Sequence, residues 1–145
     1  MERDIKELIK LGLDALPLAY TPYSNFKVAA VLETLDGRVY TGVNIENAAY
    51  TPTNCAERTA FFKAISEGDR RFRRIVVLGG KGGIPEEGTA PCGVCRQVMM
   101  EFCDPKTFEV IIAKSEEEYR TMTLEQLLPE GFGPDNLKEV PHEDI

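Results

Sequence analysis

Three of the four cysteines stand in two short motifs that could hold one metal ion. The first motif is C-A-E at residues 55–57, and the second is P-C-G-V-C at residues 91–95, where two thiolates three positions apart can converge on one ion. Three protein ligands on a tetrahedral zinc leave one position for water, and a nearby carboxylate could move the protons of that water. The layout predicts a hydrolytic zinc site in which Cys55, Cys92 and Cys95 bind the metal and Glu57 transfers protons.

The remaining histidine and cysteine do not close this site. His142 is the only histidine, which excludes three-histidine zinc centres, Ser-His-Asp triads and Cys-His nucleophile pairs. We interpret it as a solvated residue of the last segment. Cys103 lies on the same predicted helix as Cys95, roughly 12 Å further along the axis, whereas a Zn–S bond is about 2.3 Å long. Cys103 is therefore predicted to be a small buried side chain, and the fourth metal position stays open.

Each motif also has a simpler interpretation. A CxxC pair alone suits a redox dithiol or half of a structural zinc site, and Glu57 could be an ordinary acidic residue in a first helical turn. Residues two apart on a helix point about 200° apart, so Cys55 and Glu57 can both face a metal only if Cys55 lies at the helix edge. Arg58 follows Cys55 by three positions and could donate hydrogen bonds to the sulfurs, which would offset the net negative charge of three thiolates on zinc. A surface arginine is the alternative.

Length and charge narrow the class of protein. A chain of 145 residues predicts one domain, and no apolar run approaches the roughly 20 residues that span a bilayer. The start of the chain is charged and lacks the apolar stretch of a signal peptide, so we expect the cysteines to be thiols or thiolates in a reducing cytoplasm. The net charge is −7, and the one basic cluster is R-R-F-R-R at 70–74. This balance disfavours nucleic acid and membrane partners and favours a small substrate.

The elements that position the motifs follow from the spacing of apolar residues. Helical spacing predicts a first helix that ends before Pro17, helices over 55–67 and 92–102, and a short helix at 124–128. Extended apolar runs predict strands at 27–34, 38–45, 74–79, 108–113 and 119–122. The order predicts a single α/β domain, a mixed sheet of about five strands with helices packed on its faces. We expect this domain to span 1–137 and the acidic tail 138–145 to be disordered.

Beyond the cysteines, the chain resembles the cytidine deaminase family in its small homotetrameric form with an all-cysteine zinc site. The shared blocks are Y-S-N-F-K-V at 23–28, N-I-E-N-A-A-Y at 44–50, N-C-A-E-R-T-A at 54–60, P-C-G-V-C-R-Q at 91–97 and E-Q-L-L-P at 125–129. Zinc nucleobase deaminases carry the signature H-x-E with P-C-x-x-C, and Cys55 stands here in place of the histidine. The resemblance covers about residues 5–137. It implies a three-layer α/β/α fold with one zinc ion per subunit.

The resemblance also implies substrate-binding residues that spacing alone does not identify. Asn44 and Glu46 would bind the ribose 3′-hydroxyl, since residues two apart on a strand share a face. Phe26 would pack against the pyrimidine ring, and the backbone of Ala56 would contact the base. From the residues alone, core packing is the simpler interpretation of Phe26, and Asn44 and Glu46 could equally be loop residues at a strand end.

The same resemblance implies that each active site contains residues of several chains. Ala48, Tyr50 and Phe132 would reach into the active site of a neighbouring subunit of the homotetramer. From the residues alone, core packing is the simpler interpretation of Phe132. No coiled coil or other assembly signal stands in the sequence itself.

The implied activity is zinc-dependent hydrolysis of cytidine and 2′-deoxycytidine to uridine and 2′-deoxyuridine with release of ammonia, a reaction of pyrimidine salvage. One alternative is a zinc deaminase acting on another aminopyrimidine, such as a nucleoside analogue antibiotic, a nucleotide or a nucleic acid. An acidic Glu46 beside the sugar would repel a 5′-phosphate, which disfavours a nucleotide. The other alternative is a structural zinc module without catalysis, which the absence of a reachable fourth ligand disfavours.

Overall fold

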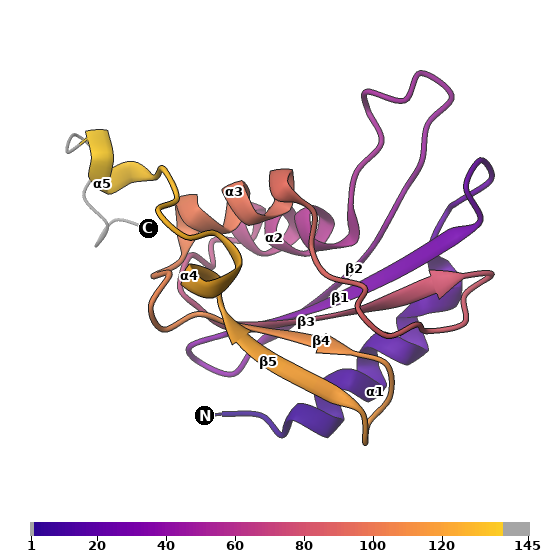
Figure 1. The fold of residues 1–145 in the computed structure, drawn as a ribbon, viewed down its shortest axis with the longest axis horizontal. Helices are drawn as coiled ribbons and strands as arrows, with labels where there is room; N and C mark the ends of the chain where they lie inside the picture. The colour runs from indigo at the N-terminus through magenta and orange to yellow at the C-terminus, as the bar shows by residue number, and fades with distance from the viewer. Residues whose placement is uncertain (1, 138–145) are drawn as a thin grey trace.

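The computed structural model describes residues 2–137, and the tail 138–145, including His142, lies outside the described residues. A five-stranded sheet runs through the centre in the order β2-β1-β3-β4-β5 (Figure 1). Its strands are β1 Phe26–Thr34, β2 Val39–Val43, β3 Phe72–Lys81, β4 Glu109–Ala113 and β5 Tyr119–Thr123. The pair β3 and β4 is parallel and the other neighbours are antiparallel, so the expected mixed sheet is confirmed.

Helices precede the first strand, follow β2 and β3, and follow the last strand. They are α1 Ile5–Ala15, α2 Ala56–Ser66, α3 Gly93–Phe102, α4 Leu124–Leu127 and α5 Pro134–Leu137, with a 3₁₀ turn at Leu16–Leu18. The expected helices and strands are present with ends shifted by one or two residues, and α5 is an addition that the apolar spacing did not predict. Within residues 2–137, no helix is long and apolar enough to cross a membrane.

The alternation of side chains along the strands divides the core into two faces. Ala29 and Val31 of β1 are fully buried with Leu8 and Ile9 of α1 on one face. Residues of β1 and β3 that point the other way lie in the second cluster, together with residues of α2 and α3; they are Ala30, Leu32, Ile75 and Val77. Figure 1 shows α1 on one side of the sheet and α2 and α3 on the other. The predicted three-layer α/β/α architecture is therefore confirmed.

A glycine on β2 allows α2 to approach the sheet closely. A Cβ atom added at Gly42 would lie 2.5 Å from the carbonyl oxygen of Ala56 and 2.5 Å from the backbone nitrogen of Ala60. Both are backbone atoms of α2, so no side-chain rotation could relieve the overlap. Gly42 thus fixes the distance between the sheet and the first turn of α2, immediately after Cys55.

Replacing Gly42 by alanine is expected to push the start of α2 away from the sheet. Overpacking against rigid backbone should lower the free energy of unfolding by about 3 kcal/mol, measured by urea denaturation. Gly12→Ala is the matched control: Gly12 is also buried, but its added Cβ meets flexible side-chain atoms of Leu78 and Val31 on the α1 face. Alanine also favours the helix there by up to about 1 kcal/mol. Equal losses in both variants would contradict a special role of Gly42.

Candidate metal and catalytic site

Three cysteine sulfurs converge where α2 and α3 begin. The Sγ atoms of Cys55 and Cys92 lie 3.8 Å apart and those of Cys92 and Cys95 lie 3.5 Å apart, with all three ligand atoms within 4.8 Å of one another. Bonds of about 2.3 Å in tetrahedral geometry place two thiolates about 3.8 Å from each other. The three sulfurs therefore fit zinc without rearrangement. This is the one cluster of three or more potential metal ligands among the described residues.

Two of the three sulfurs belong to residues that cap a helix. Cys55 is the N-cap of α2 and Cys92 is the N-cap of α3, and both have extended backbone angles outside the helix. Neither side chain makes a capping hydrogen bond, so both sulfurs remain free to face the metal position. The condition that Cys55 lies at the helix edge is met. Glu57 occupies the first turn of α2. Because Cys55 does not have helical backbone angles, the angle of about 200° between helical residues two apart does not apply to this pair, and both side chains can face the metal position.

Glu57 is buried beside the sulfurs. Its side chain is only 4% exposed, and burial, followed by the charge on Cys55, raises its pKa to about 7. A carboxyl group with this pKa can both accept and return a proton near neutral pH, which an exposed glutamate cannot do efficiently. The environment thus suits a proton-transfer group rather than an ordinary residue of a first helical turn.

The site favours negatively charged sulfur. A hydrogen bond from Cys95, and after it the guanidinium of Arg58, lower the pKa of the Cys55 thiol to about 5, while the pKa of Cys95 is raised because its proton is shared with Cys55. Arg58 donates from Nη2 to the Sγ atom of Cys55 over 3.2 Å. A divalent cation would take the place of the shared protons and allow all three thiolates to form. Arg58 therefore lies beside the sulfurs, as predicted. The alternative of a surface arginine without contact to the site does not apply.

Cys103 lies at the far end of α3. It is the C-cap of that helix, is 6% exposed and is absent from the metal-binding cluster. Burial raises the pKa of its thiol well above the ordinary value, which keeps it protonated. Its behaviour is that of the small buried side chain predicted from the sequence.

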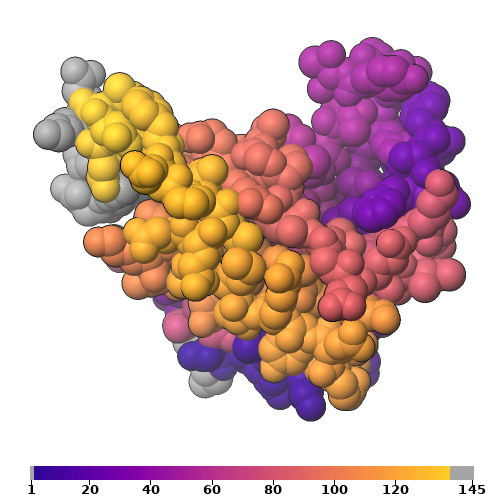
Figure 2. Space-filling model, viewed as in Figure 1, coloured from indigo at the N-terminus to yellow at the C-terminus, as the bar shows by residue number. Residues whose placement is uncertain are grey.

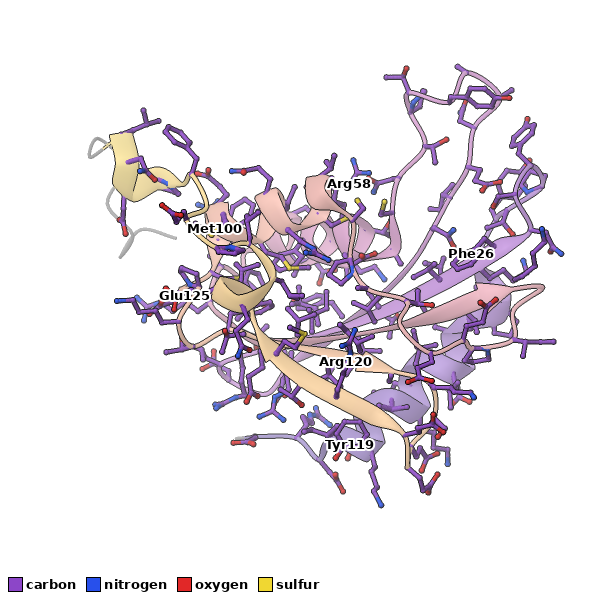
Figure 3. The ribbon with its side chains drawn as sticks, in the orientation of Figure 1. Phe26, Arg58, Met100, Tyr119, Arg120 and Glu125 are labelled. Atoms are coloured by element: carbon purple, nitrogen blue, oxygen red, sulfur yellow. The ribbon has the colours of Figure 1, made fainter. Side chains whose placement is uncertain are left out.

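Asn44 fixes the first residues of β1. Its Oδ1 atom accepts the backbone N–H of Val28 over 2.9 Å, and its Nδ2 atom donates to the carbonyl oxygen of Phe26 over 2.8 Å. These two hydrogen bonds of the side-chain amide extend the hydrogen-bond ladder between β2 and β1 by one pair. One Nδ2 hydrogen remains available for a ligand. Phe26 begins β1 on the face of α2 and α3, and its side chain is 36% exposed. Figure 3 shows Phe26 and Arg58 on the side of the sheet opposite α1.

Glu46 holds the loop that leads into β1. Its Oε1 atom accepts the backbone N–H groups of Tyr23 and Ser24 over 2.9 and 3.2 Å, and its Oε2 atom accepts the hydroxyl of Ser24. The hydroxyl of Ser24 and these N–H groups hold the pKa of Glu46 below its ordinary range. Glu46 is thus ionised and oriented at the same edge of the sheet as Asn44.

Three predicted site residues lie on segments that project from the body of the domain. Ala48 and Tyr50 belong to the segment 44–54, which extends beyond the helices, and Tyr50 is 73% exposed (Figure 1). Phe132 lies in the segment after α4 and is 58% exposed. Figure 2 shows a hollow between the segment 44–54 and the start of α3. Core packing, the simpler interpretation of Phe26 and Phe132, is wrong because both rings remain accessible.

Ala56 is the first residue of α2 and is fully buried. Its side chain therefore cannot meet a ligand, and contact with a base would depend on its backbone. Its carbonyl oxygen already lies against Gly42. The prediction of a backbone contact to the substrate is not tested by these distances and stays a prediction.

Two residues that directly follow Cys95 hold distant segments around the site, and the apolar spacing did not identify them. The guanidinium of Arg96 donates to the carbonyl oxygen of Pro91 over 2.8 Å and to that of Leu127 over 2.6 Å. The side-chain amide of Gln97 donates to the carbonyl oxygen of Phe132 over 2.8 Å. One helix turn thereby fixes the backbone before Cys92 and the segment that carries Phe132. A cation next to a CxxC motif was the only sequence signal for this arrangement.

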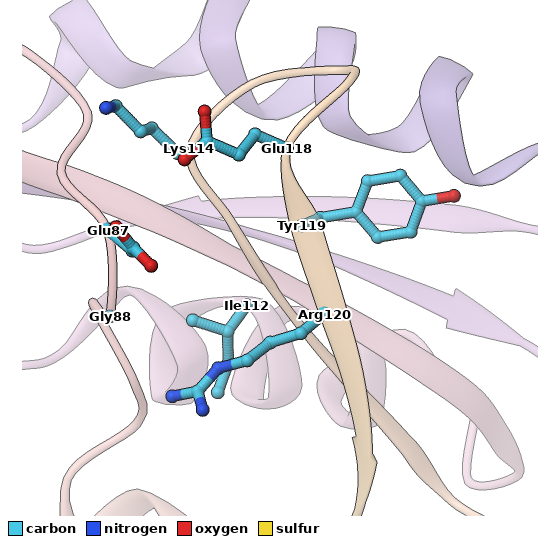
Figure 4. Close-up of a pocket in the computed structure, with 7 residues that line it drawn as sticks. All are labelled: Glu87, Gly88, Ile112, Lys114, Glu118, Tyr119 and Arg120. Atoms are coloured by element: carbon cyan, nitrogen blue, oxygen red, sulfur yellow. The ribbon is translucent and has the colours of Figure 1, made fainter.

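A second hollow lies beside the turn between β4 and β5 and does not compete for the assignment. Its volume is about 100 Å³, against roughly 300 Å³ or more for a typical small-molecule pocket. Its lining residues, drawn in Figure 4, are Glu87, Gly88, Ile112, Lys114, Glu118, Tyr119 and Arg120. Arg120 and Tyr119 point to opposite sides of β5 (Figure 4), and no cysteine lines the space. The hollow is too small for a nucleoside.

Comparison with known proteins identifies the family. Residues 2–111 match the family described as "Cytidine and deoxycytidylate deaminase zinc-binding region". The chain belongs to this family. The match includes all three clustered cysteines and Glu57, so the zinc-binding character of the family coincides with the residues that the structure brings together.

Relatives within the deaminase family match over nearly the whole chain. The cytidine deaminase of Sporosarcina psychrophila is 43% identical over 134 residues, which cover 92% of this chain and 95% of the relative. The cytidine deaminase of Halalkalibacterium halodurans is 44% identical over 137 residues, covering 94% of this chain and 99% of the relative. The crystal structure of cytidine deaminase from Burkholderia pseudomallei aligns with a TM-score of 0.80 at 45% identity, covering 90% of this chain and 100% of that structure.

Removal of one clustered sulfur is expected to abolish zinc binding. Cys92→Ala leaves two thiolates, and two ligands should retain less than about a tenth of the metal after gel filtration. Cys103→Ala is the matched control because it removes a sulfur from the same helix at its far end. Elemental analysis of the purified variants checks both, and a full zinc complement in Cys92→Ala would contradict the three-sulfur site.

Proposed function

We propose that the protein hydrolyses cytidine and 2′-deoxycytidine to uridine and 2′-deoxyuridine with release of ammonia. The observation that carries this proposal is a buried Glu57, with a pKa near neutral, beside three sulfurs spaced for one zinc ion. Membership of a zinc-binding deaminase family and relatives named cytidine deaminase support the substrate class. A structural zinc module would have no need for this carboxyl group.

The proposed chemistry divides between the metal and the chain. Zinc, when held by Cys55, Cys92 and Cys95, supplies a Lewis acid that makes water nucleophilic near neutral pH. Glu57 accepts a proton from the attacking water and delivers it to N3 of the pyrimidine. After oxygen has bonded to C4, Glu57 takes the remaining proton from that oxygen and passes it to the amine; the C4–N bond breaks as the C4=O bond forms, and ammonia leaves. Arg58 stabilises the thiolate of Cys55 throughout.

Recognition of the nucleoside is proposed to use the edge of the sheet beside the helix starts. The exposed ring of Phe26 packs against the pyrimidine, and the buried Ala56 offers backbone atoms to the base. Asn44 and Glu46 bind the 3′-hydroxyl of the sugar with the donor and acceptor positions that their structural hydrogen bonds leave free. The charge of Glu46 disfavours a substrate with a 5′-phosphate.

We further propose a homotetramer in which Ala48, Tyr50 and Phe132 complete the site of a neighbouring subunit. The exposed aromatic side chains of Tyr50 and Phe132 support this, because large accessible rings on projecting segments are typical of contact surfaces. Residues 1–137 form the deaminase domain in this proposal. Four cysteines without disulfides suit the cytoplasm, where salvage of nucleosides would take place.

Ammonia release from cytidine tests the activity, with Glu57→Gln as the critical variant. Loss of the proton carrier should lower kcat by about 10²–10⁴-fold while one zinc ion per chain remains bound. Glu125→Gln is the matched control because Glu125 also lies in the first turn of a helix but is exposed (Figure 3). Cytidine 5′-monophosphate serves as the competing substrate. Turnover by Glu57→Gln at the wild-type rate would refute the assignment.

Sedimentation velocity tests the assembly, and subunit mixing tests the shared site. A tetramer of 16.2 kDa chains should sediment at about 65 kDa at micromolar concentration. Glu57→Gln and Phe132→Ala subunits, each of low activity alone, should regain activity when co-assembled, because some sites then contain an intact Glu57 and an intact Phe132 from different chains. A monomer with full activity is the outcome that excludes shared sites.

A further inference from the structure

A serine hydroxyl connects the two groups proposed to recognise the sugar and the base. Ser24 donates from Oγ to the Oε2 atom of Glu46 over 2.5 Å, and the same Oγ atom accepts the backbone N–H of Phe26 over 3.0 Å. The chain of contacts runs from the carboxylate through one hydroxyl to the backbone that carries the aromatic ring. Ser24 itself is exposed, so burial of its side chain does not explain these contacts.

The remaining contacts of Glu46 leave one position open. A carboxylate offers about four acceptor positions, and Glu46 uses two on Oε1 for the backbone of Tyr23 and Ser24 and one on Oε2 for the Ser24 hydroxyl. The free position is therefore on Oε2, the atom that Ser24 contacts. Without the hydroxyl, Oε2 loses the one partner that the described residues give it, and the carboxylate is held through Oε1 alone. It can then tilt about Oε1, so that Oε2 no longer keeps a single direction.

The start of β1 is fixed from its other side by Asn44, which bonds to the backbone of Phe26 and Val28. Asn44 and Ser24 thus hold Phe26 from both sides, one through its carbonyl oxygen and the other through its N–H group. The distance between the ring of Phe26 and the free acceptor of Glu46 is consequently set by side-chain hydrogen bonds rather than by core packing.

We infer that Ser24 is a positioning residue for nucleoside recognition, which aims Oε2 of Glu46 at the 3′-hydroxyl of a substrate whose base lies against Phe26. This inference rests on the proposed function, since it concerns how the same site recognises its substrate. Within the described residues, the hydrogen bonds of the Ser24 hydroxyl reach Glu46 and the backbone of Phe26, and neither the metal ligands nor Glu57. Asn44 still holds the backbone of Phe26 when that hydroxyl is removed, so the contact to the sugar is the main loss.

The test compares cytidine with 3′-deoxycytidine, which lacks the hydroxyl that Glu46 is proposed to bind. Ser24→Ala should raise KM for cytidine about tenfold with kcat within about twofold of wild type, and should leave KM for 3′-deoxycytidine unchanged within about twofold. Ser24→Thr keeps the hydroxyl and should restore KM for cytidine. Where 3′-deoxycytidine turns over slowly, its inhibition constant replaces KM.

Ser115→Ala is the matched control. Ser115 also accepts a backbone N–H, that of Glu118, in the turn between β4 and β5, away from the sulfurs. It should change neither constant. An equal rise in KM for both substrates in Ser24→Ala would show a general loss of loop structure and would overturn the inference, as would failure of Ser24→Thr to restore the wild-type value.

Glu46→Gln separates failure of this inference from failure of the proposed function. If Glu46→Gln distinguishes the two substrates and Ser24→Ala does not, the role of Ser24 is refuted and the ribose role of Glu46 stands. If neither variant distinguishes them, the ribose role of Glu46 is refuted together with that of Ser24. A wild-type protein that deaminates neither nucleoside overturns the proposed function and, with it, this inference.

Discussion

The convergence of three sulfurs at two helix starts is the constraint on which the rest of the site depends. Thiolates within 4.8 Å of one another repel strongly in a partly buried position, so the full set of charges forms only around a cation. Helix N-termini lessen the repulsion because their free N–H groups and dipoles favour negative charge. Arg58 adds a positive charge on the outside of Cys55. The fold therefore supplies a position that suits a divalent metal.

Keeping that convergence costs local stability at two helix starts, which other contacts offset. Cys55 and Cys92 occupy N-cap positions where serine, threonine, aspartate or asparagine would bond to the backbone, and neither makes such a bond. Gly42 brings α2 within contact of β2 at the turn that follows Cys55, and Arg96 ties the backbone before Cys92 to the end of α4. These contacts replace the missing caps by fixing both helix starts relative to the sheet.

The sequence predicted the metal ligands, the sheet and the helices because these follow from local rules. Ligand spacing limits which sulfurs can meet, and the need for Cys55 to lie at a helix edge was recognisable from the angle between residues two apart. The roles of Ser24, Arg96 and Gln97 were not recognisable from spacing. Their side chains bond to groups that are distant in the chain or in an adjacent loop, and such pairs leave no periodic pattern.

Aromatic residues show most clearly where sequence reasoning is ambiguous. Phe26 and Phe132 fit a core as well as a binding surface by composition, and only their exposure of 36% and 58% separates the two. Phe26 is held in its accessible place by the hydrogen bonds of Asn44 and Ser24 to its backbone, and the backbone of Phe132 is held by Gln97.

Polar side chains therefore position both rings where apolar packing does not reach. An aromatic ring that is fixed but unburied lacks the packing that would stabilise it within one chain, and it gains that packing only from a ligand or from another subunit. Because the backbone that carries each ring is held before either binds, the entropy lost when the rings are covered is mainly that of side-chain rotation.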